Sequence, residues 1–163
     1  MKSVIFTIIL LSRHFNSHGQ EEEIPLTKNV IYAVGGRQSV MGIYYERNKH
    51  VSKHVFLAGH IGYSTIQGDD AMPNPQFSRD NFLTTGITGL VGIRPIYFEI
   101  GIDPVIGFYD NTTFVNLDGN IGFRIQILKK SGHFFQVCYA PILYTTHHNN
   151  FNIPFGMAIG LCF

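Results

Sequence analysis

The last ten residues of the chain, Pro154-Phe155-Gly156-Met157-Ala158-Ile159-Gly160-Leu161-Cys162-Phe163, constrain its fold more than any other segment. Large apolar side chains occupy alternate positions, and every residue between them is Gly, Ala or Cys. The large residues are Phe155, Met157, Ile159, Leu161 and Phe163. Since successive side chains of a strand point to opposite faces, one face is wide and apolar and the other is nearly bare. This pattern predicts the closing strand of a narrow barrel whose outside contacts lipid and whose inside is crowded.

The same period of two recurs along the chain, and no segment shows a helical period. No apolar run reaches the roughly 18 residues that a membrane-spanning helix needs. The predicted strands cover residues 29–35, 39–48, 53–65, 82–93, 95–108, 113–128, 133–145 and 153–163. The sequence therefore predicts an all-β fold, an antiparallel up-and-down transmembrane β-barrel of about eight strands.

The N-terminal segment is typical of an export signal. Lys2 supplies a positive start, residues 4–11 form an apolar core, and Ser17-His18-Gly19 offers small residues for cleavage before Gln20. A first strand or a disordered tail is the alternative interpretation. We expect a cleaved signal peptide over residues 1–19, a short periplasmic leader over 20–28 and the barrel over 29–163.

The lengths of the connections agree with a barrel in an outer membrane. With an even number of strands, both termini lie at the inner side, and the inward connections are short: residues 47–52, 94–95 and 129–132. The outward connections 66–81 and 146–152 are longer and polar, whereas the first one, Gly35-Gly36-Arg37-Gln38, is tight. Short periplasmic turns with longer external loops are the expected asymmetry of outer-membrane barrels.

The charge content and the number of cysteines exclude some classes of protein. Charged residues are only 14% of the chain, against roughly 25% in ordinary soluble proteins. Cleavage of the signal would remove Lys2 and Arg13 and leave a nearly neutral chain, so nothing indicates a nucleic acid partner. Cys138 and Cys162 are too few for a disulfide scaffold. Both fall on the face expected to point inward, as buried thiols or as neighbours across the final hairpin.

The export signal, the eight alternating strands, the segment Tyr44-Tyr45-Glu46-Arg47 and the terminal Phe163 together resemble the small outer-membrane β-barrel proteins of Gram-negative bacteria. The resemblance covers the chain from about Asn29 to Phe163. It implies an outer-membrane location, insertion by the barrel-assembly machinery and recognition of the final strand, through its alternating apolar residues, by that machinery. It implies no particular activity.

Polar residues recur on the face that alternation assigns to the interior. They are Glu46, His60, Glu99, Asp103, Asp118, Asn120, Arg124 and Gln126. An eight-stranded barrel is only wide enough for side chains to fill it. Because isolated charges there would be costly, we expect Arg124 to bridge one or more carboxylates. We interpret the set as a structural network that fixes strand register; a proton or ion path, or glycosidic chemistry by Glu99 and Asp103, is the alternative.

Other polar residues indicate chemistry only weakly. His147 and His148 lack a Cys or carboxylate at ligand spacing, and Asp69-Asp70 lacks the regular spacing of a calcium loop. No phosphate-binding loop, nucleophile elbow or zinc-protease motif occurs. We therefore expect no catalytic residue, no metal and no cofactor.

Aromatic residues near the strand ends are typical of the girdles that face lipid headgroups, although stacking on a sugar or lipid ligand is an alternative. The expected girdle residues are Tyr32, Tyr45, Tyr63, Phe108, Tyr109, Phe135 and Tyr144.

Three classes of function remain. The leading hypothesis is an integral outer-membrane barrel with a structural, surface-binding or adhesive role and no open pore, in contact with outer-membrane lipid and an unknown extracellular ligand. The second is an outer-membrane lipid-modifying enzyme, for which Ser64 or Ser78 with His147 or His148 are the candidates. The third is a soluble lipocalin-like binding barrel, which should carry polar residues outside and large apolar residues inside. The last strand has the reverse arrangement.

Overall fold

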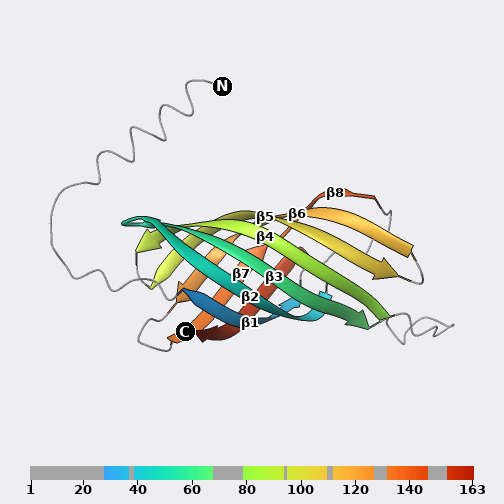
Figure 1. Ribbon diagram of the computed structural model, residues 1–163, viewed down its shortest axis with the longest axis horizontal. Helices are drawn as coiled ribbons and strands as arrows, with labels where there is room; N and C mark the ends of the chain where they lie inside the picture. The colour runs from blue at the N-terminus through green and yellow to red at the C-terminus, as the bar shows by residue number, and fades with distance from the viewer. Residues whose placement is uncertain are drawn as a thin grey trace, which may run out of the picture.

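The computed structural model describes residues 28–36, 39–67, 79–93, 95–109, 112–126, 132–146 and 154–163. Over these residues the chain is all-β, and its antiparallel strands close into an eight-stranded barrel (Figure 1), as the sequence predicts. The strands are β1 (Asn29–Gly36), β2 (Ser39–Ser52), β3 (Val55–Gln67), β4 (Arg79–Ile93), β5 (Ile96–Tyr109), β6 (Thr112–Gln126), β7 (Gly132–Tyr139), β8 (Ile142–Thr145) and β9 (Phe155–Cys162). The described part of the chain contains no helix long and apolar enough to cross a membrane.

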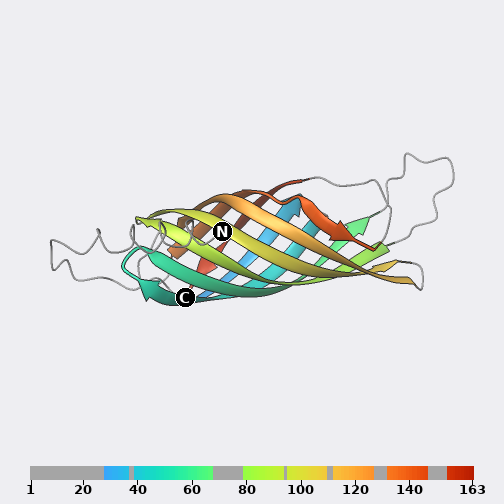
Figure 2. The same cartoon turned by 90° about the horizontal axis from the view of Figure 1, so that it is seen from above.

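Each strand pairs with its neighbours in sequence, from β1 through β6. Both β7 and β8 pair with β6, so together they make the seventh crossing of the barrel. The strands of the front and back walls cross obliquely in Figure 2, as the tilt of a closed barrel requires.

The barrel closes where β9 meets β1. The amide of Asn29 donates to the carbonyl of Phe163 at 3.1 Å, and the amide of Phe163 donates back to Asn29 at 2.9 Å. Next to this pair, the amide of Asn48 donates to the carbonyl of Lys28 at 2.7 Å. These bonds bring the beginning of β1, the end of β9 and the second half of β2 to one end of the barrel, which we call the terminal end.

The seventh crossing is interrupted, whereas the sequence predicted one strand over residues 133–145. Pro141 separates β7 from β8, because proline has no amide hydrogen to donate to a ladder. Its carbonyl still accepts from the amide of Gly119 at 2.8 Å. A side chain at Gly119 would begin 3.3 Å from the Pro141 ring, so the absence of one gives the proline room.

The strand β2 is longer than predicted, and the prediction of a turn over residues 47–52 is wrong. The strand continues to Ser52, and the turn consists of Lys53 and His54. The run from Arg47 to Ser52 has the polar composition of a loop, but it continues the strand at the terminal end.

The two faces of the barrel differ sharply in character. On β5 the outward side chains are Ile96, Phe98, Ile100, Ile102, Ile106 and Phe108, all of them exposed. Between them, Tyr97, Glu99, Asp103 and Val105 are buried inside. The expected alternation is present along β4, β5 and β6, except at Gly119, which is buried between two inward residues of β6. It produces an apolar outer surface around an interior that holds the buried charged residues.

Aromatic rings fill one part of the interior. Tyr32 stacks on Tyr44 with ring centroids 5.4 Å apart, and Phe134 lies 4.9 Å from Tyr32. The Tyr44 hydroxyl donates to Thr84 at 3.2 Å. Tyr32 is therefore buried, and its assignment to an outer girdle is wrong. Alternation along β1 places Tyr32 inward, whereas the prediction relied only on its position near the end of the strand.

The other expected girdle residues that the structure describes lie outside. Tyr45, Tyr63, Phe108, Phe135 and Tyr144 are exposed, and the side chain of Tyr109 is outside the described part. The Tyr45 hydroxyl donates to Asn29 at 2.8 Å, and the Tyr63 hydroxyl donates to Asn81 at 2.6 Å.

Two glycines on β3 provide a matched test of the two faces. We expect Gly62→Ala to lower the free energy of unfolding by about 1–3 kcal/mol, because its Cβ would overlap the ring of Tyr44. Gly59→Ala meets nothing within 4 Å, and removal of a strand glycine should be neutral or stabilising by up to about 1 kcal/mol. Urea unfolding of both variants in detergent measures the difference. Equal losses would contradict the assignment of Gly62 to the interior.

Candidate functional site

An ionic cluster occupies the centre of the interior, and we define it as Arg124, Glu46, Glu99 and Gln136. The Arg124 guanidinium donates two hydrogen bonds to Glu46, Nη1 to Oε1 at 2.5 Å and Nη2 to Oε2 at 2.9 Å. Its Nε donates to Oε2 of Glu99 at 3.1 Å. The Gln136 amide donates to the other oxygen of Glu99. All three guanidinium nitrogens thus donate, and the two bonds to Glu46 have the bidentate geometry that makes arginine–carboxylate pairs strong.

Four strands supply the ionic cluster: β2, β5, β6 and β7. Each member sits at an inward position of its strand, and alternation alone puts it there. Phe134, two residues before Gln136, lies beneath the guanidinium with its ring centroid 4.8 Å from Arg124 Cζ. Arg124 is 1% exposed, and both carboxylates are completely buried. The cation is therefore held by two carboxylates and an aromatic face rather than by water.

A second polar group lies beside Gly86. The Nε2 atom of His60 is 3.2 Å from Oδ1 of Asp103, although their geometry is not aligned for a hydrogen bond. Asp103 is directly opposite Asp118 in the ladder between β5 and β6. Like charges directly across a ladder repel each other.

The structure thus shows where all the residues of the expected network lie. Glu46, His60, Glu99, Asp103, Asp118, Asn120, Arg124 and Gln126 are all buried. The ionic cluster joins Arg124 to Glu46 and Glu99, and His60 lies next to Asp103 in a separate group. Sequence reasoning missed Gln136 and Phe134, although alternation along the strand at 133–145 would have placed both inward.

The two cysteines are also inside, and neither forms a disulfide. Cys162 is opposite Gly132 in the ladder between β7 and β9, and Cys138 is opposite Gly156. They are therefore not cross-strand neighbours, and the interpretation as two separate buried thiols holds. The five large residues of the last strand, Phe155, Met157, Ile159, Leu161 and Phe163, all point outward.

The residues considered for catalysis do not form a site in the described part of the chain. Ser64 is buried inside the barrel. Ser78, His147, His148, Asp69 and Asp70 lie outside the described residues. Among the residues that are described, no group of three or more His, Cys, Asp or Glu side chains could hold a metal ion.

Comparison with known proteins gives no relative. No model of a protein family, no curated protein and no solved structure matches this chain.

Proposed function

We propose that this chain is an integral outer-membrane β-barrel protein with a structural, surface-binding or adhesive role and without an open pore. The observation that carries the proposal is the inverted distribution of side chains. Large apolar residues are exposed on every strand of the barrel, from Ile31 on β1 to Leu161 on β9, while charged residues are buried inside. This apolar surface is far larger than the apolar patches that soluble monomers expose to water.

The charges outside the barrel support the same proposal. All four acidic side chains that the structure describes, Glu46, Glu99, Asp103 and Asp118, are buried. The described lysine and arginine side chains outside the barrel are Lys28, Arg47, Lys49 and Lys53, and they all lie at the terminal end. The rest of the described outer surface carries no described charged side chain and many large apolar ones. Such a surface suits hydrocarbon, and the cations of the terminal end suit a headgroup region.

A soluble lipocalin-like barrel is the alternative, since it has the same number of strands. Cell fractionation separates the two possibilities. We expect the full chain, expressed in a Gram-negative host, to enter the outer membrane, to lose residues 1–19 and to change its gel mobility on boiling. Recovery of the folded protein from the soluble periplasm without detergent would contradict the membrane proposal and favour the lipocalin-like barrel.

The filled interior leads to an expectation about conduction. Arg124, Phe134, Gln126 and Glu46 are among the largest fully buried side chains, and eight strands leave no continuous aqueous lumen around them. Protein reconstituted in planar bilayers should therefore give no stable, porin-like conductance. Large and reproducible openings would contradict the filled interior and favour a transport role.

The barrel-assembly machinery is the proposed partner during insertion. The outward residues of β9 form a continuous apolar strip ending at Phe163, and β9 is the strand that closes the barrel against β1. An adhesive or surface-binding role would reside in the longer connections at the end of the barrel opposite the termini.

A further inference from the structure

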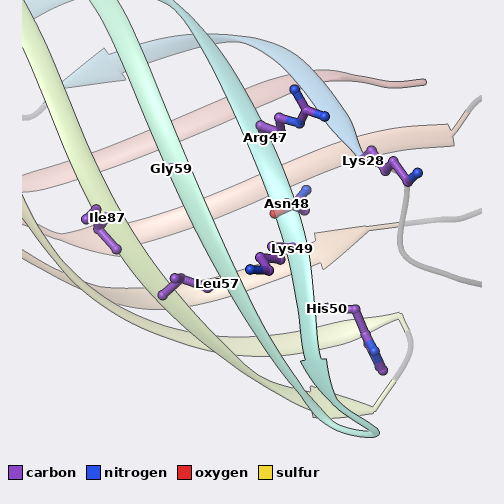
Figure 3. A pocket seen from close by; sticks show the side chains of 8 residues that line it. All are labelled: Lys28, Arg47, Asn48, Lys49, His50, Leu57, Gly59 and Ile87. Carbon is purple, nitrogen blue, oxygen red and sulfur yellow. The ribbon is translucent and has the colours of Figure 1, made fainter.

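A groove on the outside of the barrel is the feature that the proposed function leaves unexplained. We define the lateral groove by Lys28, Arg47, Lys49, Leu57, Gly59 and Ile87, which line a depression of about 500 Å³ at the terminal end (Figure 3). Gly59 forms its floor, since it lies between Arg47 on β2 and Ile87 on β4 in the ladders. A Cβ atom at Gly59 would meet nothing within 4 Å, so the space is open.

One end of the lateral groove is cationic. Arg47 and Lys49 are exposed neighbours on the outward face of β2. Lys28 precedes β1, and its backbone is anchored because its carbonyl accepts from the amide of Asn48 at 2.7 Å. Arg47 pairs with Asn29, the first residue of β1, so Arg47, Lys49 and Lys28 all line the groove near the start of β1.

The other end of the lateral groove is apolar. A second depression of about 500 Å³ also borders Gly59 and Ile87, and it continues along the barrel toward Ile61, Ile102 and Pro104. The two depressions adjoin at Gly59, where the absence of a side chain leaves the space open. From Lys49 to Tyr45, which lines the second depression, the strand advances by roughly 13 Å.

We infer that the lateral groove binds one anionic phospholipid from the side. The phosphate would lie between Arg47, Lys49 and Lys28, and an acyl chain would run over Gly59 between Leu57 and Ile87. Charge complementarity favours an anionic lipid, because no acidic side chain among the described residues lies on the outer surface to compensate these cations. The inference rests on the proposed membrane location, since only a bilayer delivers a lipid to the wall of a barrel.

The test measures lipid preference. The protein would be inserted into vesicles of equal parts phosphatidylglycerol and phosphatidylcholine, extracted in mild detergent and analysed by native mass spectrometry. We expect the wild type to retain one phosphatidylglycerol in preference to phosphatidylcholine. Arg47→Gln with Lys49→Gln should reduce that preference by roughly fivefold for each charge removed. Lys53→Gln removes a cation from the turn outside the groove and should leave the preference unchanged.

A second variant tests the acyl-chain part of the site. Gly59→Leu should fold, because its side chain enters open space, but it should reduce retention of phosphatidylglycerol while all three cations remain. If Gly59→Leu retained phosphatidylglycerol as well as the wild type does, and inorganic phosphate displaced the bound molecule, the assignment to a lipid would be overturned.

Insertion is checked first by the mobility shift on boiling. A chain that does not enter vesicles overturns the proposed function and the lipid site with it. A barrel that inserts normally but retains both lipids equally overturns only the lipid site.

Discussion

Arg124→Met is expected to lower the free energy of unfolding by about 3–5 kcal/mol, because it leaves Glu46 and Glu99 buried without their cation. Methionine keeps much of the length of the side chain and removes only its charge and donors. Urea unfolding of the barrel in detergent or lipid measures the loss. Lys53→Met is the matched control, since Lys53 is exposed in a turn and its replacement should change stability by less than about 0.5 kcal/mol.

Coupling within the ionic cluster gives a sharper form of this test. Adding Glu46→Gln and Glu99→Gln to Arg124→Met should recover part of the loss, because no uncompensated carboxylate of the ionic cluster then remains. Strictly additive effects would show that the three side chains do not interact. A loss no greater than that of Lys53→Met would mean that Arg124 reaches water and that the inward face assigned to β6 is wrong.

Ile100→Arg is expected to cost about 2–4 kcal/mol of stability in a bilayer and to impair insertion severely. Ile100 is 56% exposed on the outer face in the middle of β5, where arginine would meet hydrocarbon. Ile93→Arg is the matched control, because Ile93 ends β4 beside a turn and is 74% exposed. Near an interface the same change should cost only about 0–1 kcal/mol.

The amount of each variant recovered in the outer membrane tests this prediction. Normal levels of Ile100→Arg would contradict a membrane-embedded outer face, since a soluble barrel gains solubility from an added surface charge. Gly101→Arg probes the opposite face of the same strand. It should also be harmful, but through crowding, because even a Cβ atom there would come within 2.7 Å of the Ile87 carbonyl oxygen.

Much of the barrel could be predicted from the sequence because alternation is local and strict. Residues such as Leu83 and Ile87 on β4 reveal their faces without knowledge of any partner strand. The details that depend on pairing were not accessible. The single hydrogen bond from the Gly119 amide to the Pro141 carbonyl, at the point where the proline interrupts the seventh crossing, becomes apparent only when β6 and the broken strand lie side by side.

The same limit applies to the interior. Alternation places Arg124, Glu46 and Glu99 inside, but it does not say which carboxylate the guanidinium meets. That choice depends on the stagger of strands around the closed barrel, which no single strand encodes. Tyr32 illustrates a second limit, because an aromatic residue near a strand end suits both an outer girdle and an inner stack.

The bridge between Arg124 and Glu46 joins residues that are 78 positions apart in the sequence. Its strands, β6 and β2, lie on opposite walls, separated by β3, β4 and β5 along one route and by β7, β9 and β1 along the other. We therefore expect the bridge to form late in folding, once the curved sheet has brought its opposite walls together. Interactions absent from the folding transition state control the rate of unfolding rather than the rate of folding. Arg124 should thus slow the unfolding of the barrel. We expect Arg124→Met to unfold faster while its rate of insertion remains almost unchanged. Stopped-flow measurements of both rates test this, and a slower insertion would contradict it.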